Sequence, residues 1–148
     1  LTENISPNYN PTNYIGRSEP VYTYERAERE ISMTLKLVAQ TPDELEMIYK
    51  KMDRLTSLCY PEYVEDTYGN RMKPPLTKLR MGELFGKANK EQLGYIKSIS
   101  YAVDNSSTYE SEEGKRVPRH VNATIGYQVI HDRPPRLGTT FYGINQNG

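Results

Sequence analysis

Alternation of apolar and polar residues is the clearest signal in this chain. In residues 31–37, Ile-Ser-Met-Thr-Leu-Lys-Leu, apolar side chains occupy every second position, which predicts a half-buried β-strand. The same period recurs in residues 95–103 and 120–131 and, over a shorter length, in residues 76–81. One face of the 95–103 strand is expected to hold Tyr95, Ile99, Tyr101 and Val103.

One amphipathic helix is predicted to follow the first of these strands. Thr41, Pro42 and Glu44 supply three start signals, namely an N-cap threonine, a proline at the first helical position and the glutamate of a capping box. Apolar residues then recur at spacings of three and four, and Pro61 ends the pattern. Such a stripe is expected to lie on a sheet. It consists of Leu45, Ile48, Tyr49, Met52, Leu55 and Leu58.

The remaining segments lack a clear period. Residues 1–20 are rich in Asn, Pro, Ser, Thr and Tyr. They predict an extended arm whose Tyr9 and Tyr14 contact a neighbouring surface, with disorder as the alternative for about the first eight residues. Residues 62–75 read as a long connection or a loose hairpin, and residues 104–119 as a charged loop. The expected organisation is an arm at 1–19, a folded domain at 20–137 and a C-terminal tail at 138–148.

Together these elements predict a mainly β chain with one helix, of the α+β class. An antiparallel β-sandwich or barrel with the helix packed against it suits the order strand, strand, helix, strand, strand, strand, in which alternation begins at Val21. A length of 148 residues is that of one domain able to bury most of its apolar surface.

Composition narrows the classes of partner. Lys and Arg together number 19, as do Asp and Glu, so the net charge of zero gives no general attraction to nucleic acid. No stretch approaches the roughly 18 consecutive apolar residues that a membrane-spanning helix needs. Cys59 is the one cysteine and therefore forms no internal disulfide.

Candidate chemistry is sparse. Cys59 with His120 or His131 is the one possible nucleophile pair, but Cys59 directly follows the apolar stripe, which favours a buried thiol. Two histidines and one cysteine supply at most three of the four ligands of a zinc site, without the usual spacings. The segment Gly82–Lys87 lacks the spacing of a phosphate loop. We therefore expect no enzyme activity, no catalytic residues, no cofactor and no metal.

Several short motifs do carry a family resemblance. They are Tyr14-Ile-Gly16-Arg-Ser-Glu-Pro20-Val-Tyr-Thr-Tyr-Glu25, Glu30-Ile-Ser-Met-Thr-Leu-Lys-Leu, Leu58-Cys-Tyr60-Pro61-Glu-Tyr63, Met72-Lys-Pro-Pro75-Leu-Thr-Lys-Leu79, Tyr95-Ile-Lys-Ser-Ile-Ser-Tyr101-Ala-Val-Asp104 and Ile130-His131-Asp132. Over about residues 14–135 the chain resembles the tube-fold baseplate proteins of contractile-tailed phages, the proteins that cap the baseplate hub and initiate the tail tube.

The resemblance implies a structural role. Members of this family form six-fold rings whose inner strands join into one barrel around the channel for DNA. The implied partners are further copies of this chain in a hexameric ring, the neighbouring hub and tail tube proteins, and DNA only in passage, with no membrane. The implied location is the baseplate of the virion, after assembly in the host cytoplasm.

The polar faces of two predicted strands then become the candidate lining of that channel. These residues are Ser32, Thr34, Lys36, Asn122, Thr124 and Gln128. The alternative function is a monomeric binding module for glycans or single-stranded nucleic acid. The chain has 13 tyrosines and no tryptophan, and surface tyrosines can serve such a module as stacking platforms.

Overall fold

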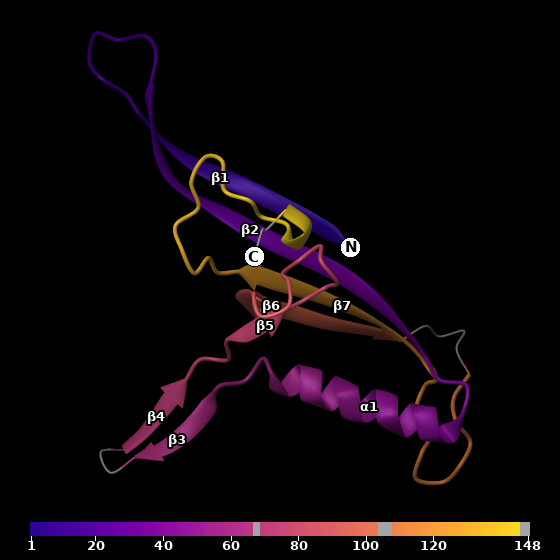
Figure 1. Cartoon of the computed structure of the whole chain (residues 1–148). Coiled ribbons are helices and arrows are strands. Elements are labelled where there is room, and N and C mark those ends of the chain that lie inside the picture. Colours follow the sequence, from indigo (N-terminus) through magenta and orange to yellow (C-terminus); the bar gives the residue numbers. More distant parts are fainter. Residues whose placement is uncertain (67–68, 104–107, 146–148) are drawn as a thin grey trace.

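The computed structural model describes residues 1–66, 69–103 and 108–145. Five strands form one antiparallel sheet in the order β1-β2-β7-β6-β5, and β3 and β4 form a separate hairpin (Figure 1). The elements are β1 (Thr2–Thr12), β2 (Val21–Val38), α1 (Pro42–Ser57), β3 (Glu62–Asp66), β4 (Gly69–Lys73), β5 (Thr77–Leu79), β6 (Gln92–Val103), β7 (His120–Val129) and a short 3-10 turn, η1 (Gly143–Asn145).

The mainly β class with one helix is confirmed. The strands predicted from alternation correspond to β2, β5, β6 and β7, although β5 covers only Thr77–Leu79 of the predicted 76–81 and β7 ends at Val129 rather than at residue 131. The segment predicted as a long connection or loose hairpin contains the β3–β4 hairpin. A sandwich or barrel is not formed within the described part of the chain, because the main sheet is open and has two edge strands. Residues 104–107 of the predicted charged loop lie outside the described residues.

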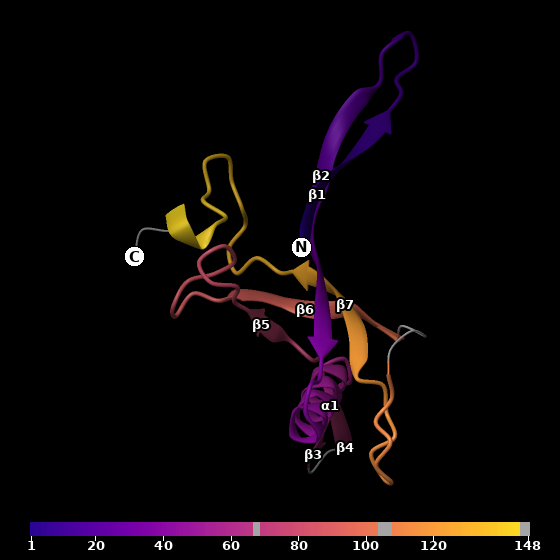
Figure 2. The same cartoon turned by 90° about the vertical axis from the view of Figure 1, so that its right-hand side faces the viewer.

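β2 is the longest strand and has different neighbours along its length. Its 18 residues extend about 60 Å at about 3.3 Å per residue. β1 pairs with it from Val21 to Ser32, and β7 pairs with it from Glu30 to Val38. β1 and β2 therefore project beyond the rest of the sheet as a hairpin, here called the arm and defined as residues 5–28 (Figures 1 and 2). Of the arm predicted at residues 1–19, residues 2–12 form strand β1, which is hydrogen-bonded to β2.

Two β-bulges change which side chains share a face. β2 carries the extra residue Glu25, because Asn8 pairs with Arg26 and the next residue of β1 pairs with Tyr24. β6 carries the extra residue Lys97 in the same way. A bulge shifts the alternation by one.

The bulge at Lys97 makes the predicted face of β6 wrong at one position. Ile96, not Tyr95, lies opposite Tyr127 on the apolar face. Tyr95 lies opposite Gln128 on the other face and is 39% exposed.

The apolar face of the sheet holds the core. Buried residues of β2, β7 and the loop before β6 form one cluster, against which α1 and the C-terminal segment also pack. The cluster consists of Ile31, Met33, Phe85, Ile125, Tyr127 and Val129, with Leu55, Leu79, Met81, Ile96 and Tyr142 partly buried against it.

α1 begins with the predicted capping box. The Thr41 side chain accepts a hydrogen bond from the Glu44 N–H, and the Glu44 carboxylate accepts one from the Thr41 N–H. The Tyr101 hydroxyl of β6 lies 3.0 Å from the Thr56 Oγ1 and holds the helix on the sheet. Within the part of the chain that the structure describes, no helix is long and apolar enough to cross a bilayer.

The predicted helix stripe is only partly buried. Leu45 is 3% exposed, whereas Leu58 is the C-cap residue beyond the last helical turn and is 40% exposed. The other four members, Ile48, Tyr49, Met52 and Leu55, are half-buried. The stripe is therefore fully buried only at Leu45, and its C-terminal member Leu58 is exposed.

Part of the predicted C-terminal tail packs on the body. The Ile144 N–H donates to the Glu83 carbonyl at 3.0 Å, and the Gly143 N–H donates to the Leu84 carbonyl at 3.4 Å. A Cβ at Gly143 would lie 2.1 Å from the Gly86 carbonyl oxygen, so a side chain does not fit there. Residues 141–144 are thus part of the folded unit.

Candidate functional site

The polar face of the sheet brings the six predicted channel-facing residues together. The register places Thr34 opposite Thr124 and Lys36 opposite Asn122, on the side opposite to the apolar cluster. The two threonine Oγ1 atoms lie 3.4 Å apart. Ser32 and Gln128 belong to the same face. Thr34, Lys36 and Thr124 are exposed and the other three are half-buried; that these side chains face a channel remains a prediction.

β6 extends this polar face with residues that were not singled out from the sequence. Ser98 lies opposite Gly126, and Ser100 lies opposite Thr124. A Cβ at Gly126 would lie 2.7 Å from the Ser98 Oγ, so the Ser98 hydroxyl occupies the space that a side chain at position 126 would need. The Lys97 ammonium lies 3.0 Å from the Glu30 carboxylate, whose hydrogen bond and charge raise the pKa of Lys97. Ser98 and Ser100 alternate with the apolar residues Ile99 and Tyr101 along the chain, and this alternation could have identified the two serines as members of the polar face.

One end of the sheet has only three strands. β1 stops pairing at Ser32, and β5 covers only Gln92–Leu93–Gly94 of β6. Residues 33–38 of β2, 120–125 of β7 and 99–103 of β6 therefore form a three-stranded end, and among the described residues both of its edges lack a neighbouring strand. Open edges present unpaired N–H and C=O groups to another strand.

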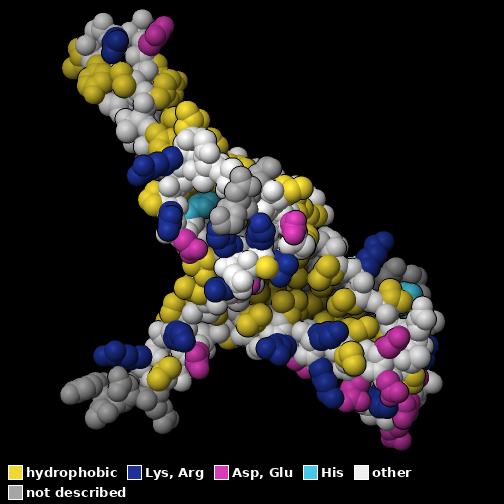
Figure 3. All heavy atoms as spheres, in the orientation of Figure 1, with side chains coloured by type: hydrophobic (Ala, Val, Ile, Leu, Met, Phe, Trp, Pro, Cys, Tyr) yellow, Lys and Arg dark blue, Asp and Glu magenta, His cyan; other side chains and the backbone are white. Residues whose placement is uncertain are grey.

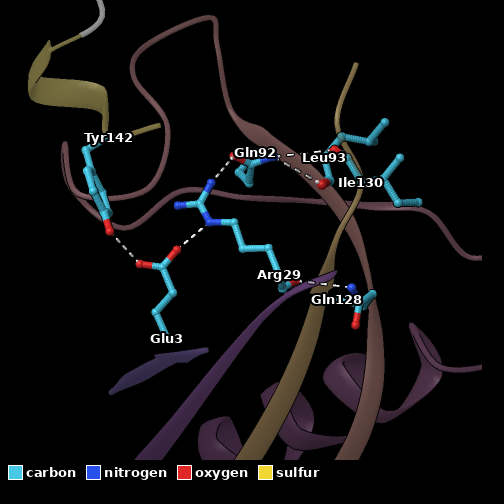
Figure 4. Close-up of polar contacts among 7 residues, drawn as sticks. All are labelled: Glu3, Arg29, Gln92, Leu93, Gln128, Ile130 and Tyr142. Carbon is cyan, nitrogen blue, oxygen red and sulfur yellow. Dashed lines mark hydrogen bonds and ion pairs between the residues drawn. The ribbon is translucent and has the colours of Figure 1, made fainter. Parts of the chain in front are cut away.

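A buried arginine holds the opposite part of the sheet together (Figure 4). The Arg29 side chain is 3% exposed, and its Nε donates to the Glu3 carboxylate, which also accepts from the Tyr142 hydroxyl at 2.9 Å. The Nη1 of Arg29 is 3.5 Å from the Gln92 side-chain oxygen. The Arg29 carbonyl accepts a hydrogen bond of 3.2 Å from Gln128. Arg29 thus ties β1, β6, β7 and the C-terminal segment to the base of the arm.

Aromatic rings surround the same guanidinium. Its carbon lies 5.5–5.7 Å from the ring centroids of Phe85, Phe141 and Tyr142. Its third nitrogen, Nη2, is buried and has no hydrogen-bond partner among the residues that the structure describes. N–H groups over aromatic faces gain a weak compensating attraction. The cluster is therefore best described as a structural clamp.

A cavity of about 880 Å³ opens beside this clamp. Its walls include the basic residues Lys78, Lys90 and Arg133 and also the acidic Glu91 and Asp132. His131 lies in the wall, and burial together with the charge of Arg29 lowers its pKa. In residues 1–66, 69–103 and 108–145 no group of three His, Cys, Asp or Glu could hold a metal ion.

The exposure of Cys59 contradicts the prediction. The thiol was predicted to be buried, but Cys59 is exposed, because the chain leaves the helix before this residue and turns. His131 lines the cavity whereas Cys59 does not. The candidate pair of Cys59 with His131 is therefore not brought together at that cavity.

The arm carries an aromatic face, defined here as Ile5, Tyr9, Tyr22 and Tyr24. Tyr9 and Tyr24 are paired across the strands, with ring centroids 5.4 Å apart in an edge-to-face arrangement. All four side chains are more than half exposed, and Figure 3 shows hydrophobic side chains along the arm. Sequence reasoning named Tyr9 as a contact residue and missed Tyr22 and Tyr24.

Comparisons with known protein families and with curated proteins find no match to this sequence. The function is therefore inferred from the faces and edges of the sheet.

Proposed function

We propose that this chain is a structural subunit of a contractile phage tail baseplate. Its copies form a ring that connects the central hub to the tail tube and lines the DNA channel. The observation that supports this most is the three-stranded end, which has an open polar face, α1 on its apolar face and two open edges. That the assembly is a ring around a tail channel is suggested by the resemblance of the sequence motifs to the tube-fold baseplate proteins.

Ring closure would join the two open edges of neighbouring copies. Copies related by rotation about an axis present their edges at the same level, so residues 33–38 of β2 meet residues 99–103 of β6 in the next copy. β2 and β6 are both antiparallel to β7, so this junction is a parallel pair. Closing a sheet on itself removes edges that would otherwise aggregate. The barrel expected from the sequence is in this proposal a property of the ring.

The chemistry of the polar face suits passage of DNA. Hydroxyl and amide side chains dominate the three-stranded end, and Lys36 is the one formal charge among the described residues of that face, within 33–38, 99–103 and 120–125. Tight binding of DNA requires several cationic contacts to phosphates, and each adds affinity. Glu30 and Lys97, which lie on this face beyond the three-stranded end, form an ion pair and cancel. A lining with so little net charge therefore lets DNA move without being held.

A size-selective labelling experiment tests the proposal. In a Cys59→Ser background, Thr34→Cys is placed on the polar face and Lys50→Cys on the exposed outer side of α1. In assembled rings seen by electron microscopy, a small maleimide should label both positions. A large polymer-linked maleimide should label Lys50→Cys but not Thr34→Cys.

Equal labelling of both positions by the large reagent, in a chain that stays monomeric with its tail components, contradicts the ring. Exposed tyrosines such as Tyr14, Tyr60 and Tyr109 keep the monomeric binding module as the second candidate. Salt-dependent binding of single-stranded DNA or a glycan by that monomer would support the second candidate instead.

A further inference from the structure

The cavity beside the Arg29 clamp has no role in the ring proposed above. Its volume of about 880 Å³ falls within the range of roughly 300–1,000 Å³ that is usual for ligand pockets. Besides Arg29 of β2, three segments far apart in the sequence line it, namely β5 at Lys78, residues 89–93 around the start of β6, and parts of residues 131–141 after β7. A space of this size is large enough for a bound molecule.

The lining of the cavity carries more positive than negative charge. Its cationic residues are Arg29, Lys78, Lys90 and Arg133, and its acidic residues are Glu91 and Asp132. Among the residues that the structure describes, the two lysines and Arg133 are exposed and form no ion pair. The excess is two positive charges, or one when Glu3, the partner of Arg29, is counted. The unpaired cations are therefore available to an anionic ligand.

The charge of Arg29 acts on the cavity although its guanidinium is covered. The ring of Phe141, itself a lining residue, lies 5.5 Å from the guanidinium carbon. Water and salt screen buried charges much less than exposed ones. Burial lowers the pKa of His131 in the cavity wall, and the Arg29 charge lowers it further, with a larger effect than the opposing charge of Asp132. The field of Arg29 thus reaches the wall of the cavity.

The two acidic residues of the lining distinguish between kinds of anion. Glu91 and Asp132 would repel a polyphosphate, in which every phosphate is charged. A peptide offers both kinds of polar partner, because its backbone N–H groups donate to carboxylates and an acidic side chain accepts from cations. Leu93 and Phe141 are half-buried lining residues that supply apolar contact. The mixed lining therefore suits an acidic peptide.

We propose that this cavity binds an acidic peptide segment of a partner protein, whose carboxylate is directed to the lysine and arginine side chains of the wall. The backbone of the segment donates to Glu91 and Asp132. The inference goes beyond the proposed function, because the cavity lies apart from the polar face and from the edges of the three-stranded end. Peptide binding requires neither a ring nor a channel.

Nuclear magnetic resonance titration of the full chain tests the site. The probe is a capped pentapeptide, Gly-Glu-Gly-Glu-Gly, and the matched control peptide has Gln in place of both Glu residues. The Glu peptide should shift the backbone amide signals of Leu93 and Phe141 and the imidazole signals of His131. A few exposed ion pairs together correspond to about a tenfold difference in affinity, so the Gln peptide should bind about tenfold more weakly.

Substitutions of exposed charges then locate the contact. Lys78→Gln with Lys90→Gln should weaken binding of the Glu peptide about fivefold. The matched control, Lys50→Gln with Lys51→Gln on the exposed side of α1, should leave the affinity unchanged. Asp132→Asn removes a repulsive charge and should strengthen binding about twofold. A gain in affinity of this kind cannot result from loss of folding.

The outcomes separate this inference from the proposed function. Equal binding of the Glu and Gln peptides, or unchanged affinity in the variant at Lys78 and Lys90, overturns the site. Inorganic pyrophosphate that shifts the same signals at lower concentration than the Glu peptide also overturns the peptide and favours a phosphate ligand. A chain that forms rings without binding the peptide overturns only this inference. Peptide binding by a chain that never forms rings supports the site and contradicts the ring.

Discussion

The two halves of β2 form an informative comparison. In the body, Ile31 is fully buried and Met33 is 8% exposed. In the arm, Tyr22 and Tyr24 lie on the same face of the same strand and are more than half exposed. The side-chain pattern is similar in both halves, and the difference is that the helix and the C-terminal segment cover only one of them. An apolar face therefore identifies what can be buried, not what is buried within one chain.

This difference determines where the stability of the single chain resides. Burying a large apolar side chain contributes about 1.5–3 kcal/mol, and the exposed side chains of the arm gain little of this within one chain. The stability of the single chain should therefore depend on the body and only weakly on the arm. Substitutions matched between the two regions measure this difference.

The largest contrast is expected between two isoleucines on the apolar face. Ile31→Ala removes a fully buried side chain and should lower the free energy of unfolding by about 2–5 kcal/mol, as cavity-forming substitutions do. Ile5→Ala, in the 53% exposed position at the base of the arm, should change it by less than about 0.5 kcal/mol. Urea denaturation followed by circular dichroism measures both. Equal losses would show that the arm is part of the folding core.

The next effect concerns two ion pairs. Glu3→Gln leaves the buried Arg29 without its carboxylate and should cost about 2–4 kcal/mol, somewhat below the value for a fully buried pair because Glu3 keeps 15% exposure. Glu28→Gln breaks the pair with Arg26 in the arm, where both side chains are more than half exposed, and should cost less than about 0.5 kcal/mol. Urea denaturation at a single pH measures the loss of stability in each of the two variants. A small effect of Glu3→Gln would show that the aromatic rings alone stabilise Arg29.

Deleting Glu25 should have a small effect on folding and should leave the two faces of the arm unchanged. Because the bulge lies in the arm, removing one residue should change the free energy of unfolding by less than about 1 kcal/mol. Tyr24 would then directly precede Arg26 in a regular ladder and stay opposite Tyr9, so the contact between the two tyrosine rings should persist. Nuclear Overhauser contacts between the two rings measure this, and their loss would show that the bulge itself is needed to bring Tyr24 to the face of Tyr9.

The smallest effect is a pH dependence in the loop after β6. The Arg119 guanidinium and the Ser111 N–H lower the pKa of Glu110, which is buried. A carboxylate with a lowered folded pKa adds stability above its unfolded pKa of about 4.3, and that stability is lost as the pH falls through the folded value. Glu110→Gln should flatten the dependence of thermal stability on pH between about pH 5 and pH 3, relative to the unsubstituted chain. A melting-temperature curve parallel to that of the unsubstituted chain would contradict this.

The sequence predicted those features correctly that depend on residues within a single short segment. Thr41, Pro42 and Glu44 predicted the start of α1, and both reciprocal hydrogen bonds of the capping box are present. Alternation in residues 31–37 predicted the core face of β2 because that segment has no bulge. Residues 1–12 gave no such signal, since their asparagines and prolines show no period. They become a strand because β2 offers them an edge.

The candidate site was predictable in part. The six polar positions on β2 and β7 fell on one face because both strands are regular over that length. Tyr95, Tyr22 and Tyr24 were assigned wrongly or missed, because a bulge depends on the pairing of two strands and leaves no mark in one of them. Arg29 gave no sign of burial, since its partners Glu3, Gln92 and Tyr142 come from distant segments.

The sequence by itself determined the strand periods, the helix with its cap and the separation of polar from apolar positions, because these depend on backbone geometry within a few residues. Only the tertiary structure decided the strand order, the two bulges, the clamp around Arg29 and the open three-stranded end. Each of these requires contacts between segments far apart in the chain. Burial is a property of such contacts, which is why the same apolar face of β2 is core at Ile31 and open surface at Tyr24.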